Sequence, residues 1–414
     1  MTFEEKLREY ARLAVRAGIA VRPGQEVLIL APLETAPFVR LCAREAYAAG
    51  AKDVVVEWSD DELTRLHYDH TDAEACGRCP DGLAQRRNAL AERGAAILSI
   101  RSQDPAALAG VDAAKPAAYI KALHAECAPF YKAQRSGAVC WSIIGAAGPA
   151  WAKAVFPGLP EDEAVARLWE AIFKTVRVGE GDALAAWQAH RRSFEKRIAW
   201  LNAQNFTALH YKNALGTDIT VGLPENVRWA GGGSAAADGR WHFANMPTEE
   251  VFTSPDRLRA EGTVVASMPL NYSGSLVRDF RFTFHEGRVV DFDAKEGREV
   301  LRGILDEDDN ARYLGECALV PAASPISEMG LLFYDTLYDE NASCHFALGR
   351  GFASSVEGGG QLDEQGLLAK GINQSDVHVD FMLGTKDLAI TGVCADGRRV
   401  PVFVNGNWAE GVEG

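Results

Sequence analysis

The chain has 414 residues, of which 47% are hydrophobic and 24% charged, which is ordinary for a globular protein with room for two domains. Its 43 lysines and arginines stand against 57 acidic residues, so the formal net charge is −14. A surface this acidic repels phosphate groups, and we expect neither nucleic acid nor an anionic membrane as a partner. It does not hinder binding of a divalent cation or an amine.

The expected location is the cytoplasm. No run of about 18 apolar residues is present, so no segment is expected to span a membrane. The N-terminal segment is amphipathic and mixed in charge, unlike a secretory signal. The eight cysteines are scattered, and Cys76 and Cys79 form the one CxxC pair. A zinc ribbon needs a second pair, so we interpret the cysteines as ordinary thiols.

The first half alternates between helical and strand-like patterns. Phe3, Leu7, Tyr10 and Ala14 recur at helical spacing. Short apolar runs bounded by glycine, proline or charged residues predict buried strands. We expect helices at 3–14, 37–49 and 115–134 and strands at 27–30, 54–56, 95–100 and 139–143. Strands that alternate with helices predict a parallel sheet with helices on its faces.

Residues 162–201 return to a helical pattern. A wide apolar face between Val165 and Val176 predicts one helix, and Asp182 is a good N-cap for the next. We expect these helices to bridge two domains.

The second half is mainly β. Ile219, Val221 and Leu223 alternate with polar or small residues, and 278–284, the turn 285–287 and 289–292 predict a hairpin. A helix is expected at 299–310. The predicted fold class is therefore α/β with two domains, an N-terminal parallel-sheet domain at 1–200 and a β-rich, mainly antiparallel α+β domain at 201–414 that carries the chemistry.

The segment around His378 and Asp380 offers candidate metal ligands. Side chains two apart on a strand share a face, which puts these two side by side at roughly 6–7 Å between Cα atoms. Imidazole nitrogen and carboxylate oxygen suit zinc, cobalt or manganese. A surface strand whose polar face meets water remains the alternative.

His345 follows an acidic turn and opens an apolar run. A lone histidine there is more often a structural hydrogen-bonding residue than a ligand. Cys344 is a possible soft ligand, but as the neighbour of His345 on a strand it would face away.

Two acidic segments lie next to residues that we expect to be buried. Glu249 and Glu250 lie in a loop bracketed by prolines, and Glu250 is followed at once by Val251. Glu316 heads an apolar, strand-like run. A buried carboxylate without a partner costs several kcal/mol or stays protonated, and metal ligation removes that cost. Surface acids are the default for the Glu249–Glu250 pair.

Common hydrolase signatures are absent. The sequence has no HExxH helix, no GxSxG elbow and no GxxxxGK[ST] loop. The candidate acids and histidines all lie in the β-rich half, but the sequence does not show that they converge.

At these residues the chain resembles the aminopeptidase T/aminopeptidase S family of metallo-aminopeptidases. The resemblance spans nearly the whole chain and includes Trp187-Gln-Ala-His190 in the first half. In the second half it is carried by Asn245–Pro255, Gly315-Glu316, Tyr338–Asn341, His345–Gly349 and His378–Met382.

The resemblance implies a set of metal ligands, and all five have the right side chain: Glu250, Glu316, His345, His378 and Asp380. One departure is Phe352, where the family has a tyrosine that contributes to the active site. Phenylalanine keeps the ring and loses the hydroxyl, so activity, metal occupancy or substrate preference can differ from the family's.

The implied activity is hydrolysis of N-terminal residues from peptides by a cytosolic homodimer. Two divalent ions, of zinc, cobalt or manganese, would share a bridging water and a carboxylate. We interpret Glu316 as that bridging carboxylate and, with Glu250, as catalytic. Glu249 or Glu340 could carry the proton.

Two alternatives stay open. The same fold resembles ring-cleaving dioxygenases, and His345, His378 and Asp380 would also suit a single non-haem iron. The other is a peptide-binding relative weakened by Phe352.

Overall fold

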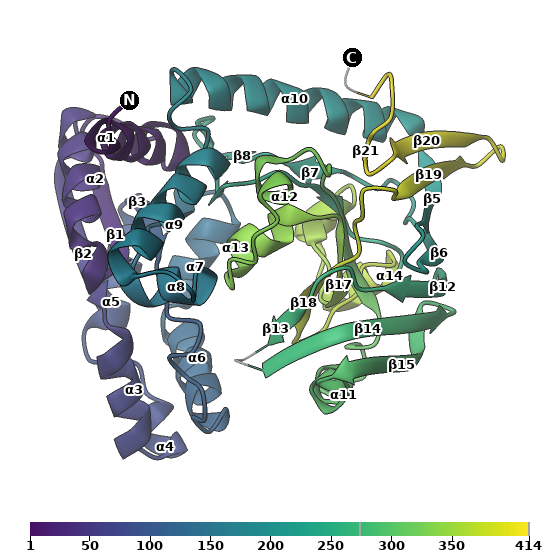
Figure 1. The fold of residues 1–414 in the computed structure, drawn as a ribbon, viewed down its shortest axis with the longest axis horizontal. Helices are drawn as coiled ribbons and strands as arrows, with labels where there is room; N and C mark the ends of the chain where they lie inside the picture. The colour runs from purple at the N-terminus through teal and green to yellow at the C-terminus, as the bar shows by residue number, and fades with distance from the viewer. Residues whose placement is uncertain (273–274, 413–414) are drawn as a thin grey trace. The chain divides into compact units, whose positions relative to one another are not determined.

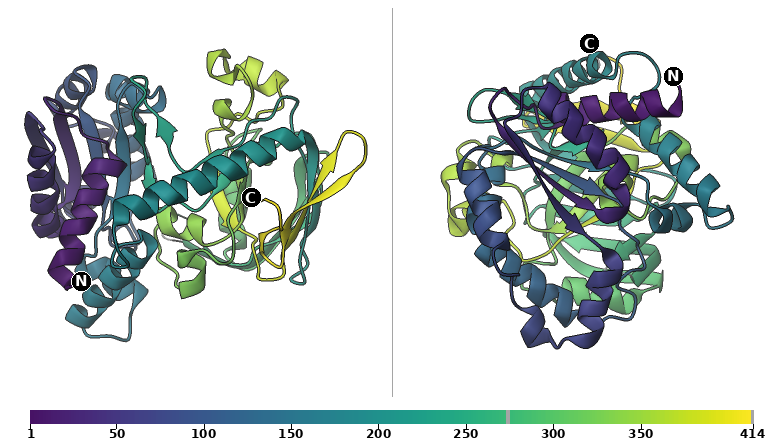
Figure 2. Two further views of the ribbon diagram at one scale, coloured as in Figure 1. Left: turned by 90° about the horizontal axis from the view of Figure 1, so that it is seen from above. Right: turned by 90° about the vertical axis from the view of Figure 1, so that its left-hand side faces the viewer.

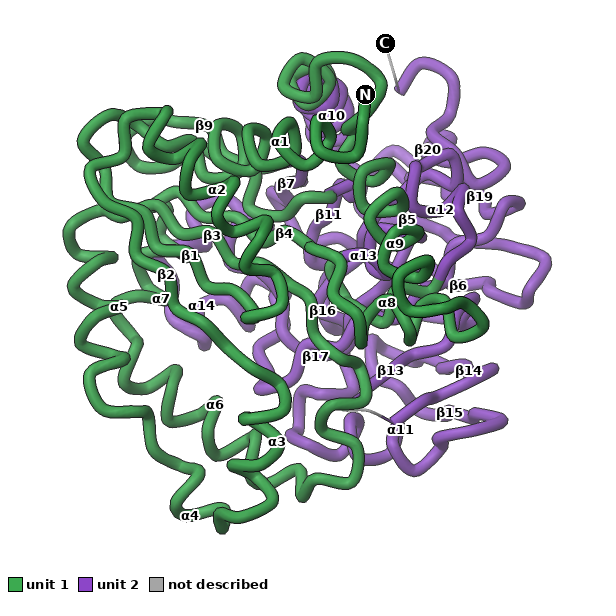
Figure 3. Tube along the Cα trace, turned by 60° about the vertical axis from the view of Figure 1, so that its left-hand side comes forward, with its two compact units in different colours: residues 1–189, 233–247, 332–337 green, residues 190–232, 248–331, 338–414 purple. Residues whose placement is uncertain are grey.

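The structure, a computed structural model, describes residues 1–272 and 275–412. Two compact units are distinguished in Figure 3. Unit 1 comprises residues 1–189, 233–247 and 332–337, and unit 2 comprises residues 190–232, 248–331 and 338–414. Two later segments of the chain thus return to unit 1. The expectation that two independently folding domains meet near residue 200 stays a prediction.

Unit 1 is built on a five-stranded, all-parallel sheet in the order β10-β4-β3-β1-β2. Strand β1 is buried on both faces, which explains its continuous apolar run. The strands are β1 (Glu26–Pro32), β2 (Asp53–Ser59), β3 (Ala96–Arg101), β4 (Trp141–Gly145) and β10 (Asn245–Met246). The parallel α/β fold expected for the first half is confirmed. Strand β10, supplied from the second half, was not predicted.

Helices fill the connections of this sheet (Figure 1). They are α1 (Phe3–Leu13), α2 (Ala36–Ala48), α3 (Asp61–His70), α4 (Ala73–Cys76), α5 (Leu83–Glu92), α6 (Ala114–Glu126), α7 (Ala128–Arg135), α8 (Pro149–Val155) and α9 (Glu161–Thr175), with a π-helix at Ala14–Gly18 and a 3₁₀-helix at Leu33–Thr35. The single helix expected at 115–134 is wrong: it breaks at Cys127, because Pro129 in the first turn of α7 cannot continue the helix before it.

The helix α10 (Ala183–Gln204) is seen along its length in Figure 2. It begins one residue after Asp182, whose carboxylate accepts a hydrogen bond from the Leu184 amide at 3.0 Å. The boundary between the units falls inside it, between Ala189 and His190. No helix among the described residues has the length and hydropathy that a membrane crossing requires.

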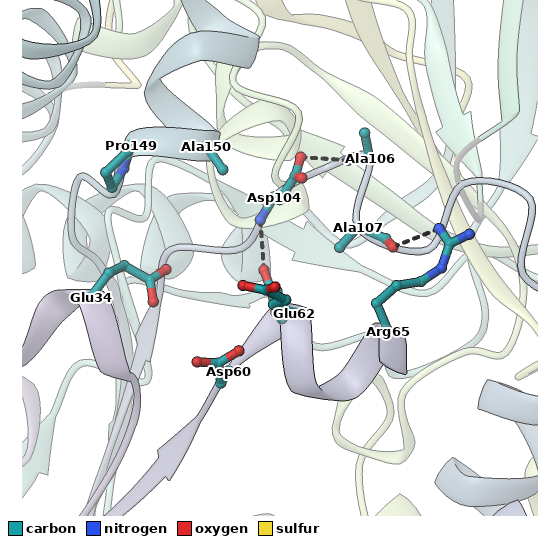
Figure 4. Close-up of a pocket in the computed structure, with 10 residues that line it drawn as sticks. Glu34, Asp60, Glu62, Arg65, Asp104, Ala106, Ala107, Pro149 and Ala150 are labelled. Atoms are coloured by element: carbon teal, nitrogen blue, oxygen red, sulfur yellow. Dashed lines mark hydrogen bonds between the residues drawn. The ribbon is translucent and has the colours of Figure 1, made fainter. Parts of the chain in front are cut away.

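An acidic pocket of about 530 Å³ lies at the carboxyl edge of the parallel sheet (Figure 4). Its acids follow three neighbouring strands and are Glu34, Asp60, Asp61, Glu62 and Asp104. Burial, with the neighbouring carboxylates, raises the pKa of Glu34 and of Asp61. Within the described residues, however, the groups that bring three metal-ligating atoms within 4.8 Å of one another lie in unit 2.

Unit 2 contains two antiparallel sheets. The larger has nine strands, β13-β14-β12-β6-β5-β19-β20-β21 with β15 paired to β14, and the smaller is β18-β17-β16-β11-β7. Their bounds are β5 (Phe206–Lys212), β6 (Asp218–Gly222), β7 (Ala230–Gly231), β11 (Val251–Thr253), β12 (Ala260–Val265), β13 (Leu270–Tyr272), β14 (Ser275–His285), β15 (Arg288–Glu296), β16 (Leu314–Leu319), β17 (His345–Gly349), β18 (His378–Met382), β19 (Ala389–Cys394), β20 (Arg399–Val404) and β21 (Asn407–Trp408).

Short helices and one small hairpin complete the chain. They are α11 (Arg298–Leu305), α12 (Pro325–Met329), α13 (Thr336–Asp339), α14 (Glu364–Ala369), the 3₁₀-helices Glu340–Ala342, Ala353–Ser355 and Gly359–Gln361, and the strands β8 (Ser234–Ala235) and β9 (Trp241–His242). The helix expected at 299–310 is real but ends at Leu305. All eight cysteines are buried free thiols, in line with the expectation from their spacing.

The turn of the β14–β15 hairpin lies at Glu286 and Gly287, as predicted. Both residues have positive φ, at 47° and 79°, as a tight hairpin turn requires. A Cβ on Gly287 would stand 1.9 Å from the carbonyl oxygen of Arg257, so only glycine fits this turn.

We predict that Gly287→Ala destabilises the protein by about 3 kcal/mol, since it adds a clash to the left-handed backbone strain. Gly397→Ala is the matched control: Gly397 also lies in a hairpin turn, has φ 84° and has no atom within 4 Å of an added Cβ. We expect it to cost about 1 kcal/mol. Urea unfolding measures both, and equal losses would contradict the clash.

Candidate metal centre

The smaller sheet of unit 2 places acidic side chains in a row. Antiparallel register puts Glu316 of β16 opposite Ala347 of β17, and Ala347 opposite Asp380 of β18. Residues opposite one another across antiparallel strands share a face, so the two carboxylates flank a methyl group. A larger residue than alanine in the middle strand would fill the space between them.

A β-bulge sets the face on which Glu316 lies. The register of β16 against β17 shifts between Leu314 and Glu316, at Gly315. A Cβ on Gly315 would stand 2.2 Å from the carbonyl oxygen of Arg350. Glycine therefore permits the close approach, and the extra residue brings Glu316 into line with Ala347.

Two histidines and a third acid complete the cluster. The His345 Nε2 lies 3.2 Å from Oε2 of Glu250, which immediately precedes β11. The His378 Nε2 lies 3.2 Å from Oε2 of Glu316 and 3.3 Å from Oδ1 of Asp380. Potential ligand atoms lie within 4.8 Å of one another in two groups: Glu250, Glu316 and His345 in the first, and Glu316, His378 and Asp380 in the second. Glu316 belongs to both groups.

Backbone carbonyls orient both imidazole rings. The Nδ1 of His345 lies 3.0 Å from the carbonyl oxygen of Ser343, and that of His378 lies 2.7 Å from the carbonyl oxygen of Arg350. A carbonyl only accepts, so each Nδ1 carries the proton and donates it. When the ring is neutral, its Nε2 lone pair then points into the cluster, as metal-ligating histidines require.

The cluster shifts the pKa of Glu316, Asp380 and both histidines. Burial, together with Glu250 and Asp380, raises the pKa of Glu316 to about 7 against the hydrogen bond from His378. Burial alone would lower the pKa of both histidines, but the carboxylates raise it to about 10 for His345 and about 11 for His378. Burial would raise the pKa of Asp380, but His378 and then His345 lower it. Without a metal, the histidine protons therefore offset part of the negative charge of the acids.

Glu340 also lies within electrostatic reach of this cluster. Burial raises its pKa well above the usual value, and Glu250 and Asp380 raise it further. The sequence suggested Glu340 as a proton carrier but did not place it in the cluster. Its position in Tyr338–Asn341, a segment that carries the family resemblance, was the signal that could have placed it there. Glu249, the other proposed proton carrier, is buried and directs its carboxylate to His190, 3.7 Å from Nε2.

Two neighbours of the cluster have other roles. Cys344 is buried and faces away, because its Sγ is 3.3 Å from both the amide nitrogen and the carbonyl oxygen of Val320. Phe352 packs its ring against His378, with centroids 5.3 Å apart, and against Phe252 at 5.2 Å. It therefore lines the cluster without offering it a polar atom.

The donor set fits divalent metal ions. Three carboxylates and two imidazoles converge, and the mixture of nitrogen and oxygen suits zinc, cobalt or manganese. The buried Nε2 of His345 and Oδ1 of Asp380 lie 3.2 and 3.3 Å from other members of the cluster, but neither atom has a contact with hydrogen-bond geometry among the described residues. Buried polar atoms normally have a partner, so both are consistent with a ligand role.

Comparison with known proteins identifies the family. Residues 3–408 match the thermophilic metalloprotease family M29. The chain belongs to this family. The relatives of this chain include aminopeptidase AmpS of Bacillus subtilis, 44% identical over 408 residues, which cover 99% of each chain. Aminopeptidase T of Thermus thermophilus is 43% identical over 406 residues, which cover 98% of this chain and 99% of that one.

Solved structures agree. The structure of wild-type AmpT from Thermus thermophilus matches with a TM-score of 0.92 at 43% identity and covers 99% of this chain and all of that one. A 2,5-dihydroxypyridine dioxygenase from Pseudomonas putida matches with a TM-score of 0.51 at 15% identity over 99% of this chain and 97% of that one. This second likeness concerns the fold alone. As a member of the M29 family, the chain is a metalloprotease.

Every residue predicted as a ligand lies in the cluster: Glu250, Glu316, His345, His378 and Asp380. Their individual roles as ligands or catalytic groups stay predictions.

Proposed function

We propose that this metalloprotease is an aminopeptidase that removes N-terminal residues from peptides at a two-ion site in unit 2. The observation that carries the proposal is that Glu316 belongs to both candidate ligand groups. One carboxylate with two oxygens can bridge two cations, which is the arrangement that two-metal hydrolases use. The names of the relatives support the activity, since AmpS and aminopeptidase T are both called aminopeptidases.

The proposed ligands divide between the two groups. Glu250 and His345 would hold one ion, His378 and Asp380 the other, and Glu316 both. Ions held there supply a water of lowered pKa and polarise the scissile carbonyl. The residues of the chain hold this arrangement in place: the carbonyls of Ser343 and Arg350 keep both Nε2 atoms directed inward.

Proton transfer is assigned to Glu340 in this proposal. Its pKa is raised well above the ordinary value by burial and by the neighbouring acids, so its carboxyl can hold a proton that is later given to the leaving amine. Glu249 is the weaker candidate because its carboxylate turns to His190.

The proposed substrate is a peptide with a free N-terminus, and the proposed metals are zinc, cobalt or manganese. The excess of acidic side chains in the site favours a substrate that presents an amino group to it over one that presents a carboxylate. That the chain forms a homodimer in the cytoplasm stays a prediction.

We predict that Glu316→Gln lowers kcat by at least about 100-fold, because an amide cannot bridge two cations as a carboxylate does. Hydrolysis of a leucine chromogenic amide in the presence of cobalt or zinc measures the effect, and thermal unfolding checks the fold. Glu261→Gln is the control, since Glu261 is an exposed acid of the same unit. A near-normal rate in a folded Glu316→Gln protein would remove the assignment.

We predict opposite effects for two neighbours on the chain. His345→Ala should lower the number of bound ions, whereas Cys344→Ala should leave it unchanged and cost only about 1 kcal/mol of stability. Elemental analysis after dialysis gives ions per chain, and we expect two for the wild-type protein. A single iron per chain would favour the dioxygenase-like alternative, and loss of metal in Cys344→Ala would contradict the arrangement of the strand.

We predict that Phe352→Tyr raises kcat by about tenfold, since it adds a hydroxyl beside the ring of His378 where a proton donor or hydrogen-bond donor can act on the substrate. Metal content should not change. Steady-state kinetics on the leucine amide measures the gain. An unchanged kcat in a folded, metal-loaded variant would show that the ring alone serves the reaction.

A further inference from the structure

The loop that carries Glu250 is held from two sides. Glu250 precedes the first residue of β11, so the register of the sheet does not fix it. The imidazole Nε2 of His190, on α10, donates to the carbonyl oxygen of Thr248 at 2.8 Å. The amide of Glu249 donates to the Oδ1 of Asn341 at 2.7 Å. These contacts restrain the two residues directly before Glu250.

The other end of the Asn341 amide contacts the neighbouring acid of its own 3₁₀-helix, Glu340. A backbone N–H can only donate, so the atom of Asn341 that faces Glu249 is the oxygen and its Nδ2 lies on the opposite side. That Nδ2 lies 3.4 Å from Oε1 of Glu340. Asn341 is fully buried. One side chain therefore joins the Glu249–Glu250 loop to the 3₁₀-helix Glu340–Ala342, although 92 residues separate Glu249 from Asn341.

The charges of the cluster explain why such a joint is needed. The two segments carry three acids, Glu249, Glu250 and Glu340, and carboxylates brought close together repel one another. The neutral amide of Asn341, which lies in the same 3₁₀-helix as Glu340, accepts from the Glu249 amide and so links the loop to that helix without adding charge. A leucine of similar shape would leave the Glu249 amide without this acceptor, which is unfavourable when the amide is buried.

We propose that Asn341 is a positioning residue that fixes the spacing of Glu250 and Glu340 and thereby sets the affinity of the site for its divalent ions. This inference rests on the proposed two-ion site. Side chains that orient metal ligands typically change metal affinity by about 10- to 100-fold when replaced.

Three variants test the proposal by calorimetric titration of the metal-free protein with Zn²⁺. Asn341→Leu keeps the branched shape of the side chain and removes its hydrogen bonds to Glu249 and Glu340, so we expect zinc affinity to fall about 10- to 100-fold in a folded protein. Asn341→Asp should restore affinity to within about threefold of wild type, because a carboxylate oxygen at this position accepts from the Glu249 amide as the Asn341 Oδ1 does. Asn202→Leu is the matched control: Asn202 also accepts from a backbone amide, that of Trp229 at 3.1 Å, in the same unit.

The inference would be overturned if Asn341→Leu bound zinc as tightly as the wild-type protein, or if Asn341→Asp did not recover affinity. Zinc binding by the wild-type protein would in either case still support the proposed function. A wild-type protein that binds no zinc would instead remove the proposed function itself. If Asn341→Leu does not fold, hydrogen exchange on the wild-type protein decides. The Glu249 amide should be protected before any metal is added, and rapid exchange there would overturn the inference.

Discussion

The register between β16, β17 and β18 is the constraint on which the metal centre depends. It aligns Glu316, Ala347 and Asp380 on one face, and aromatic packing on the other face holds it. Phe346 and Phe381 point into the core, with Phe381 5.1 Å from the ring of Phe282 on the larger sheet. A strand cannot slip by one residue without exchanging these phenylalanines for charged groups. The hydrophobic core of unit 2 therefore determines the geometry of the acids.

The same arrangement gathers negative charge where water is scarce. Carboxylates that repel one another are costly when buried, and the raised pKa values of Glu316 and Glu340 express that cost. The protonated histidines offset part of it in the metal-free chain. A divalent cation offsets it more completely, because it interacts with several carboxylates at once. The buried acids of the centre therefore destabilise the metal-free protein more than the metal-bound protein.

Much of this could be predicted from local pattern. Alternation placed His378 and Asp380 on one face, and Glu316 stood out as an acid in an apolar run. Convergence could not be predicted, because it depends on pairing between strands that lie far apart in sequence. Glu340 lies in a three-residue 3₁₀-helix, which is too short for an apolar pattern to indicate which way its side chain points. Strand β10 has only two residues, so it has no strand pattern to recognise.

The bulge at Gly315 has a consequence for how the protein can evolve. The bulge adds one residue to β16 relative to β17. Glu316 therefore lies on the metal-binding face only while β16 keeps this extra residue. A single-codon insertion or deletion between Gly315 and Glu316 would rotate the carboxylate into the phenylalanine core. The length of β16 is therefore constrained as tightly as the identity of Glu316 itself, and insertions or deletions there should be purged by selection.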